Sequence, residues 1–169
     1  IHKVKAPVLI KTTYSDEEIE ILRNSMSTNL RNLSILNLLS SSGIRVGELV
    51  KLNKSDINFS MQTGVVKGKG NKERIIYFDA KTKISLLRYS NSRDDDNDVL
   101  FVSLRNYDIK HEKRRITINN IESIIREKGK SLHLPAAYPH KFRRTIATKA
   151  IDKGMPIEQV QILLGHSKI

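Results

Sequence analysis

The feature that most restricts the fold of this 169-residue chain is one interruption of its helical hydrophobic spacing. From about residue 15 to residue 56, and again from about residue 117, apolar residues recur at helical intervals. Between these regions, Val65–Lys67 and Arg74–Phe78 are short β-prone runs on either side of the turn cluster Gly68-Lys69-Gly70-Asn71. The pattern predicts an α+β fold that is mainly α-helical, with a small antiparallel β-sheet built on one basic hairpin.

Capping residues set the expected ends of the helices. Ser15, with a glutamate three residues later, predicts a helix from about Asp16 to Met26. A leucine pattern then stops at Gly43, and a short helix is expected to open around Arg45, where backbone N–H groups favour an anion. The other expected elements are helices over 81–89, from Thr117, from Pro139 to Gly154 and from Pro156 to Gly165, and a small strand over Val99–Val102.

Length and composition predict one domain. A chain of this size buries roughly two thirds of its unfolded surface, and the sequence contains no internal repeat. Residues 1–14 have scattered lysines around Pro7 and no helical period, so we expect an extended arm or linker there and the folded domain over 15–169. Ser90–Asp98 is polar and acidic and is expected to be an exposed loop.

Charge narrows the class of partner. The chain has 30 Lys+Arg against 18 Asp+Glu, a formal charge of +12, which favours a polyanion, with nucleic acid first and an anionic membrane surface second. No apolar run approaches the ~20 residues of a membrane-spanning helix, and Pro7–Ile10 is too short for a signal-peptide core. Cysteine is absent, which excludes disulfides and thiolate metal sites. We expect a cytoplasmic, nucleoid-associated protein with no membrane partner.

Four short motifs carry residues that suit chemistry on a phosphodiester. Arginine forks onto phosphate oxygens, and histidine exchanges a proton near neutral pH. A single arginine in a basic protein is usually a solvated surface residue and a lone histidine is usually structural, but here both recur. The two motif histidines are far apart in sequence, so no metal site is expected. The motifs are Gly43–Leu49, Gly68–Arg74, His140–Arg143 and Leu164–His166.

In order and spacing these motifs resemble those of the tyrosine recombinases, a family of phage and transposon integrases and chromosome-dimer resolving enzymes. The first motif is similar to the family's first arginine box, the second to its hairpin lysine motif, and the last two to its second box. The resemblance covers about residues 15–169 and implies the fold of the family's catalytic domain. It also implies site-specific DNA cleavage and rejoining through a 3′-phosphotyrosyl intermediate, with no cofactor, neither ATP nor a divalent metal.

The resemblance also implies roles for individual residues. Arg45, Arg143 and His166 would stabilise the phosphate, because preorganised donors can hold its non-bridging oxygens without a metal. Lys69 would protonate the departing 5′ oxygen as general acid, and His140 would assist proton transfer at the nucleophile as general base.

Supporting residues are less specific. Glu48, one turn after Arg45, fits a residue that holds the arginine and a surface ion pair equally well. The residue pattern alone does not choose a general acid among the hairpin lysines; only the resemblance selects Lys69. The residues expected to contact DNA phosphates are Lys67, Lys72, Arg74, Lys141 and Arg144.

The family's nucleophile is a tyrosine on a helix after the last motif, and this sequence has none beyond Tyr138. Tyr77 and Tyr138 suit half-buried strand and loop positions. We therefore expect a catalytic domain truncated before its nucleophile, inactive as a fragment, that binds duplex DNA and assembles with other protomers, a tetramer in the full-length protein. The alternatives are a DNA-binding module without catalysis and a type IB topoisomerase-like enzyme.

Overall fold

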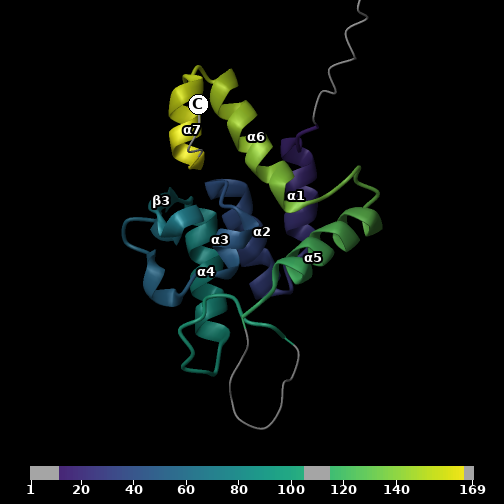
Figure 1. Ribbon diagram of the computed structural model, residues 1–169. Coiled ribbons are helices and arrows are strands. Elements are labelled where there is room, and N and C mark those ends of the chain that lie inside the picture. Colours follow the sequence, from purple (N-terminus) through teal and green to yellow (C-terminus); the bar gives the residue numbers. More distant parts are fainter. Residues whose placement is uncertain (1–11, 105–114, 166–169) are drawn as a thin grey trace, which may run out of the picture.

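The computed structural model describes residues 12–104 and 115–165, and helices make up most of this part (Figure 1). Helix α2 lies at the centre and packs against α1, α4 and α6. Helices α6 and α7 pack together at one end of the molecule, and α5 contacts α1, α3 and α6. The helices are α1 (Asp16–Ser25), α2 (Leu30–Ser42), α3 (Val46–Val50), α4 (Ala80–Ser92), α5 (Ile118–Ser131), α6 (Pro139–Asp152) and α7 (Ile157–Leu164), with 3₁₀ turns η1 (Lys54–Asp56) and η2 (Lys69–Asn71).

The predicted helix ends are confirmed where a cap fixes them. The hydroxyl of Ser15 accepts from the Glu18 amide at 3.1 Å, and the Glu18 carboxylate accepts from the Ser15 amide at 2.9 Å, which completes the capping box of α1. Helices α2 and α7 each end at a glycine in the left-handed conformation, Gly43 with φ 65° and Gly165 with φ 72°. Both glycines belong to the motifs that carry the arginines and histidines.

The core surrounds α2, which is buried on most of its circumference. This burial explains the dense run of leucines in the sequence, because a helix enclosed on most sides has few positions for polar residues. Leu36, Leu38 and Leu39 are fully buried there, and Phe142 of α6 joins the same cluster. Tyr14, assigned from sequence to the arm, packs in this core with its ring centroid 4.5 Å from that of Phe142. Residues 1–11 of the arm lie outside the described residues.

The hairpin is confirmed and forms part of a three-stranded antiparallel sheet, with strand order β1-β2-β3. Strands β2 (Thr63–Lys67) and β3 (Glu73–Tyr77) pair with Val65 opposite Ile75 and Lys67 opposite Glu73. The turn between them closes with a hydrogen bond from the Gly68 amide to the Lys72 carbonyl at 2.8 Å. The edge strand β1 (Ile57–Asn58) has only two residues, too few for an alternating pattern to show in the sequence.

In the middle of the chain one prediction is wrong and another is confirmed only in part. Val99–Val102 forms no strand but two isolated bridges, from Val99 to Asn53 and from Val102 to Arg115. The segment Ser90–Asp98 is not a wholly exposed loop, because α4 extends to Ser92 and the buried Arg93 side chain organises the residues after it. Its guanidinium pairs with Asp95 at 2.6 Å and donates to the Asn97 and Leu100 carbonyls, each at 3.0 Å. A buried arginine satisfied in this way lets a polar segment pack.

Among the helices of the described residues, none has the length and apolar character needed to span a membrane.

Candidate active site

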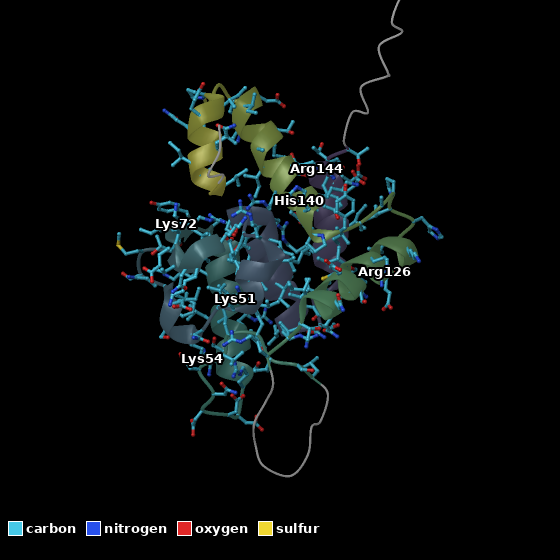
Figure 2. The ribbon with its side chains drawn as sticks, viewed as in Figure 1. Lys51, Lys54, Lys72, Arg126, His140 and Arg144 are labelled. Atoms are coloured by element: carbon cyan, nitrogen blue, oxygen red, sulfur yellow. The ribbon has the colours of Figure 1, made fainter. Side chains whose placement is uncertain are left out.

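One cleft of about 1190 Å³ collects most of the predicted site residues. It is bordered by α3, the β2–β3 hairpin, the start of α6 and the end of α7. In Figure 2, Lys72 is labelled on the hairpin side of this cleft and His140 on the α6 side. Residues from four separate parts of the sequence therefore share one space. The predicted residues that line it are Arg45, Glu48, Lys67, Lys69, Lys72, Arg74, His140 and Arg143.

Arg45 is the N-cap of α3 and the most exposed of the three arginines in the cleft, with 40% of its side chain accessible. Its Nη1 donates to Glu48 Oε1 at 3.1 Å, and its Nη2 donates to the Gly165 carbonyl at 3.2 Å. The Arg45 amide also donates to Glu48 Oε2, at 3.1 Å. The guanidinium is thus held in place on one edge while the rest faces the cleft.

Glu48 is the acceptor around which this side of the cleft is organised. Its side chain is only 4% exposed, which excludes a solvated surface ion pair as its role. Besides the two bonds from Arg45, it accepts from Arg74 Nε at 3.3 Å and from Arg74 Nη2 at 2.7 Å. Burial alone would raise the pKa of this carboxyl, but the hydrogen bonds and charges of Arg74 and Arg45 outweigh burial and lower the pKa.

Arg74 does not have the open position expected of a DNA-contacting residue, since its side chain is 15% exposed and already occupied. In addition to its fork on Glu48, its Nη1 donates to the Leu163 carbonyl at 3.2 Å. Strand alternation explains the difference: Arg74 shares the inward face of β3 with the buried Ile76. That alternation was the sequence signal for an inward-facing arginine.

Arg143, on α6, is 3% exposed and donates to two main-chain carbonyls, that of Gly43 and that of Leu164, the latter at 2.9 Å. Burial, together with the positive charges of Arg45 and Arg74, lowers the pKa of this guanidinium to about 10. Three guanidiniums around one carboxylate leave the cleft positively charged. An anion bound there would relieve the repulsion between them.

The end of α7 is attached to all three arginines. The successive carbonyls of Leu163, Leu164 and Gly165 accept from Arg74, Arg143 and Arg45 respectively. The last carbonyls of a helix have no partner within the helix, so cationic donors there satisfy them and interact favourably with the helix dipole. The cluster therefore fixes the point where the chain leaves α7. His166, the next residue, lies outside the described residues.

The hairpin side of the cleft differs, because its three lysines are exposed. Lys67 ends β2, Lys69 begins the turn η2, and Lys72 follows it. None of the three side chains makes a hydrogen bond or ion pair to the part of the chain that the structure describes. Gly70 between them has φ 72° and empty space where a Cβ would stand, so the turn is slim enough for close approach. His140, at the start of α6, is exposed to the same cleft.

Two predicted DNA contacts lie elsewhere. Lys141 is 1% exposed; its Nζ donates to the carbonyls of Pro135 at 3.0 Å and Ala136 at 3.3 Å and lies over the Tyr14 ring. Successive helical residues point about 100° apart, so the helix that exposes His140 buries its neighbour. Arg144 is partly buried, with its guanidinium 5.2 Å from the centroid of the Tyr138 ring, and it does not line the cleft.

No tyrosine among residues 12–104 and 115–165 lines this cleft. Tyr14 and Tyr89 are buried in the core, and burial raises the pKa of Tyr14. Tyr77 is exposed on β3, and Tyr138 borders a smaller pocket of about 200 Å³ beside His140. Over the same described residues, His, Asp and Glu side chains form no group of three or more that could hold a metal ion.

Comparisons with known proteins agree with this arrangement. The chain matches the phage integrase family over residues 11–169. It is 36% identical to the tyrosine recombinase XerC of Staphylococcus aureus and 31% identical to XerA of Pyrococcus horikoshii, in each case over 98% of this chain and 56% of the relative. A crystal structure of XerA recombinase matches 99% of this chain and 58% of that one, with a TM-score of 0.83 and 31% identity. The chain spans little more than half the length of these relatives. It belongs to the phage integrase family, the tyrosine recombinases, and matches their catalytic domain.

Proposed function

We propose that this chain is the catalytic domain of a site-specific recombinase that cuts and rejoins duplex DNA through a 3′-phosphotyrosyl intermediate. The observation that carries the proposal is that Arg45, Arg143, Lys69 and His140 line one positively charged cleft. Two arginines, a lysine and a histidine are the groups needed to stabilise a phosphoryl transition state and to move its protons.

In the proposed reaction a tyrosine hydroxyl attacks the scissile phosphorus, and the 5′ oxygen leaves. Arg45 offers its exposed edge to the non-bridging oxygens, and the buried guanidinium of Arg143 adds positive charge beside them. His166 is a further donor. Lys69 gives a proton to the 5′ oxygen, while His140 takes one from the tyrosine. The covalent link retains the bond energy, so the 5′ hydroxyl can attack it and rejoin a strand.

We propose that the tyrosine comes from a segment outside the described residues. The family resemblance puts this tyrosine after the Leu164–His166 motif, and no described tyrosine lines the cleft. The proposed partners are duplex DNA and other protomers of the recombinase, which form a tetramer in the full-length protein. The proposed location is the cytoplasm, in association with the nucleoid. Lys67 and Lys72 are the proposed phosphate contacts beside the reacting strand.

The test uses a tyrosine-extended protein, which is this chain followed past Ile169 by a tyrosine segment, either that of its own gene or that of a family member. Incubation with DNA carrying its recombination site should give a covalent protein–DNA adduct that resists denaturation. Replacement of the added tyrosine by phenylalanine should abolish the adduct and leave DNA binding intact.

The outcomes separate the proposal from its alternatives. DNA binding without any adduct would support a DNA-binding module and contradict the recombinase. Relaxation of supercoiled DNA that requires no particular site would support a topoisomerase-like enzyme. If the protein neither binds DNA nor forms an adduct, a DNA function for this cleft is rejected.

A further inference from the structure

Arg74 has a task different from that of Arg45. Its side chain is 15% exposed, against 40% for Arg45, and each of its three guanidinium nitrogens already donates to an acceptor within the protein. Nε and Nη2 grip both oxygens of Glu48, and Nη1 reaches the Leu163 carbonyl. A bidentate carboxylate pair with an added carbonyl bond is a strongly directional arrangement.

We propose that Arg74 is a positioning residue for the recombination reaction, which holds Glu48 and the end of α7 so that Arg45 faces the scissile phosphate. The inference rests on the proposed function, because it takes Arg45 as a ligand of that phosphate. Arg74 itself touches neither the DNA nor the reacting atoms.

Charge balance supports this role. Glu48 holds Arg45 through its guanidinium and its amide, and a carboxylate pairing with one guanidinium cancels that charge. Arg74 shares the same carboxylate from its buried side, so the group of three residues keeps a net positive charge. Glu48 can therefore fix Arg45 without removing the attraction of Arg45 for phosphate. Because the side chains of Glu48 and Arg74 are only 4% and 15% exposed, water weakens the attraction between them little.

The contacts also close into a ring. Arg45 bonds to Glu48, Glu48 to Arg74, Arg74 to Leu163, and Gly165, two residues on, accepts from Arg45. The Arg74 side chain can pack this close to Gly165 only because glycine lacks a Cβ, which would stand 2.5 Å from Arg74 Cδ. Loss of Arg74 would open the ring at two of its bonds.

The experiment measures single-turnover cleavage by the tyrosine-extended protein at saturating DNA, as a function of pH. Arg74→Gln should slow cleavage by about 10- to 100-fold, because displacing a catalytic group such as Arg45 by about 1 Å lowers the rate by about that factor. DNA affinity should stay the same. Arg74→Lys keeps one charged bond to Glu48 and should recover part of the rate. Arg88→Gln is the matched control: Arg88 is exposed on α4 and lines neither the cleft nor the smaller pocket beside His140, so the substitution should change neither quantity.

The pH profile distinguishes positioning from general structural support. Glu48 is faced by three charged groups: Arg45 and Arg74, which donate to its carboxylate, and Arg143 of α6, which interacts with it through charge alone. Losing Arg74 raises the pKa of the Glu48 carboxyl. The acid limb of the rate profile should therefore move to higher pH in Arg74→Gln and less so in Arg74→Lys. A merely destabilised protein would lose amplitude without this shift.

A Glu48→Gln background completes the test. If Arg74 acts through Glu48, Arg74→Gln added to Glu48→Gln should cause little further loss and no pH shift. Additive losses, or a reduced salt dependence of DNA binding in Arg74→Gln, would mean direct DNA contact and would overturn the inference. A wild type that cleaves no better than Arg74→Gln would also overturn it, whereas a wild type that cleaves no DNA rejects the proposed function and this inference together. Should Arg74→Gln fail to fold, Arg74→Lys carries the same comparisons.

Discussion

The two cationic sides of the cleft are built in opposite ways. On the arginine side, formed by α3, α6 and the inward face of β3, Arg45, Arg74 and Arg143 all donate to Glu48 or to main-chain carbonyls, so their positions are set before DNA arrives. On the lysine side, formed by the end of β2 and the hairpin turn, the side chains of Lys67, Lys69 and Lys72 are exposed and make no such bonds to the described residues. Fixed donors suit a transition state of one geometry, and lysines with free side chains suit DNA backbone contacts that adjust.

The largest expected effect comes from the fixed side. In the tyrosine-extended protein, Arg143→Lys should reduce cleavage by about a thousandfold, because one ammonium cannot hold both the Gly43 and Leu164 carbonyls and keep its charge where the guanidinium is fixed. Arg45→Lys should act in the same direction. Rates come from single-turnover cleavage of labelled DNA, with affinity measured separately and expected to stay within about twofold. Unchanged cleavage in both variants would mean that these arginines have a structural role only.

On the adjustable side, Lys69 should differ from its neighbours by chemistry. Lys69→Ala should lose about a hundredfold in cleavage of ordinary DNA, the usual contribution of a general acid. A substrate with sulfur in place of the bridging 5′ oxygen should restore the rate, because a thiol with a pKa of ~8.5 leaves without a donated proton.

Its controls come from both sides of the cleft. Lys72 is exposed on the same turn, so Lys72→Ala should cleave ordinary DNA at the normal rate when DNA is saturating. The sulfur substrate should not rescue Arg143→Ala, whose defect concerns the non-bridging oxygens. Rescue of Lys72→Ala in place of Lys69→Ala would reassign the general acid.

Stability offers a smaller test of how firmly the arginine side is held. In Gly165→Ala the new Cβ would stand 2.5 Å from Arg74 Cδ, at a backbone φ of 72°. Gly154→Ala has a similar positive φ, 92°, but nothing within 4 Å of the new Cβ, so it carries the backbone strain without the collision. We expect about 1 kcal/mol of lost stability in Gly154→Ala and about twice that in Gly165→Ala, seen as a lower Tm. Equal losses would show that the contact with Arg74 is soft.

Local signals predicted most of the fold. The capping box of α1, the glycine stops after α2 and α7, and the turn Gly68–Asn71 all act within a few residues, so the sequence displays them directly. The strand over Val99–Val102 failed because isolated bridges depend on Asn53 and Arg115, distant partners that no local pattern reveals.

The site was predictable only in part, for the same reason. Motif order gave the residues of the cleft through a family resemblance, since spacing alone does not bring Arg45 beside Arg143. Burial then separated residues of the same charge. Arg74 and Lys141 look like surface cations in the sequence, yet each finds acceptors far along the chain or on a neighbouring loop, Leu163 for one and Pro135 for the other. Strand and helix periodicity would have flagged both, had it been weighed against charge.

The smallest expected effect is on DNA affinity, where an exposed lysine, Lys72, should contribute and a buried one, Lys141, should not. Binding of the 169-residue chain to duplex DNA should weaken steeply with salt, as released counterions require. Lys72→Ala should reduce the slope of log affinity against log salt by about 1, the contribution of one phosphate contact. Lys141→Met, which keeps the buried stem but loses the ammonium, should leave the slope unchanged while lowering Tm, because its bonds go to Pro135 and Ala136. Fluorescence anisotropy across a salt series measures all three proteins. If Lys141→Met reduces this slope as much as Lys72→Ala does, Lys141 must point outward from α6 when DNA is bound. A wild-type affinity that does not change with salt would remove the electrostatic basis of the comparison.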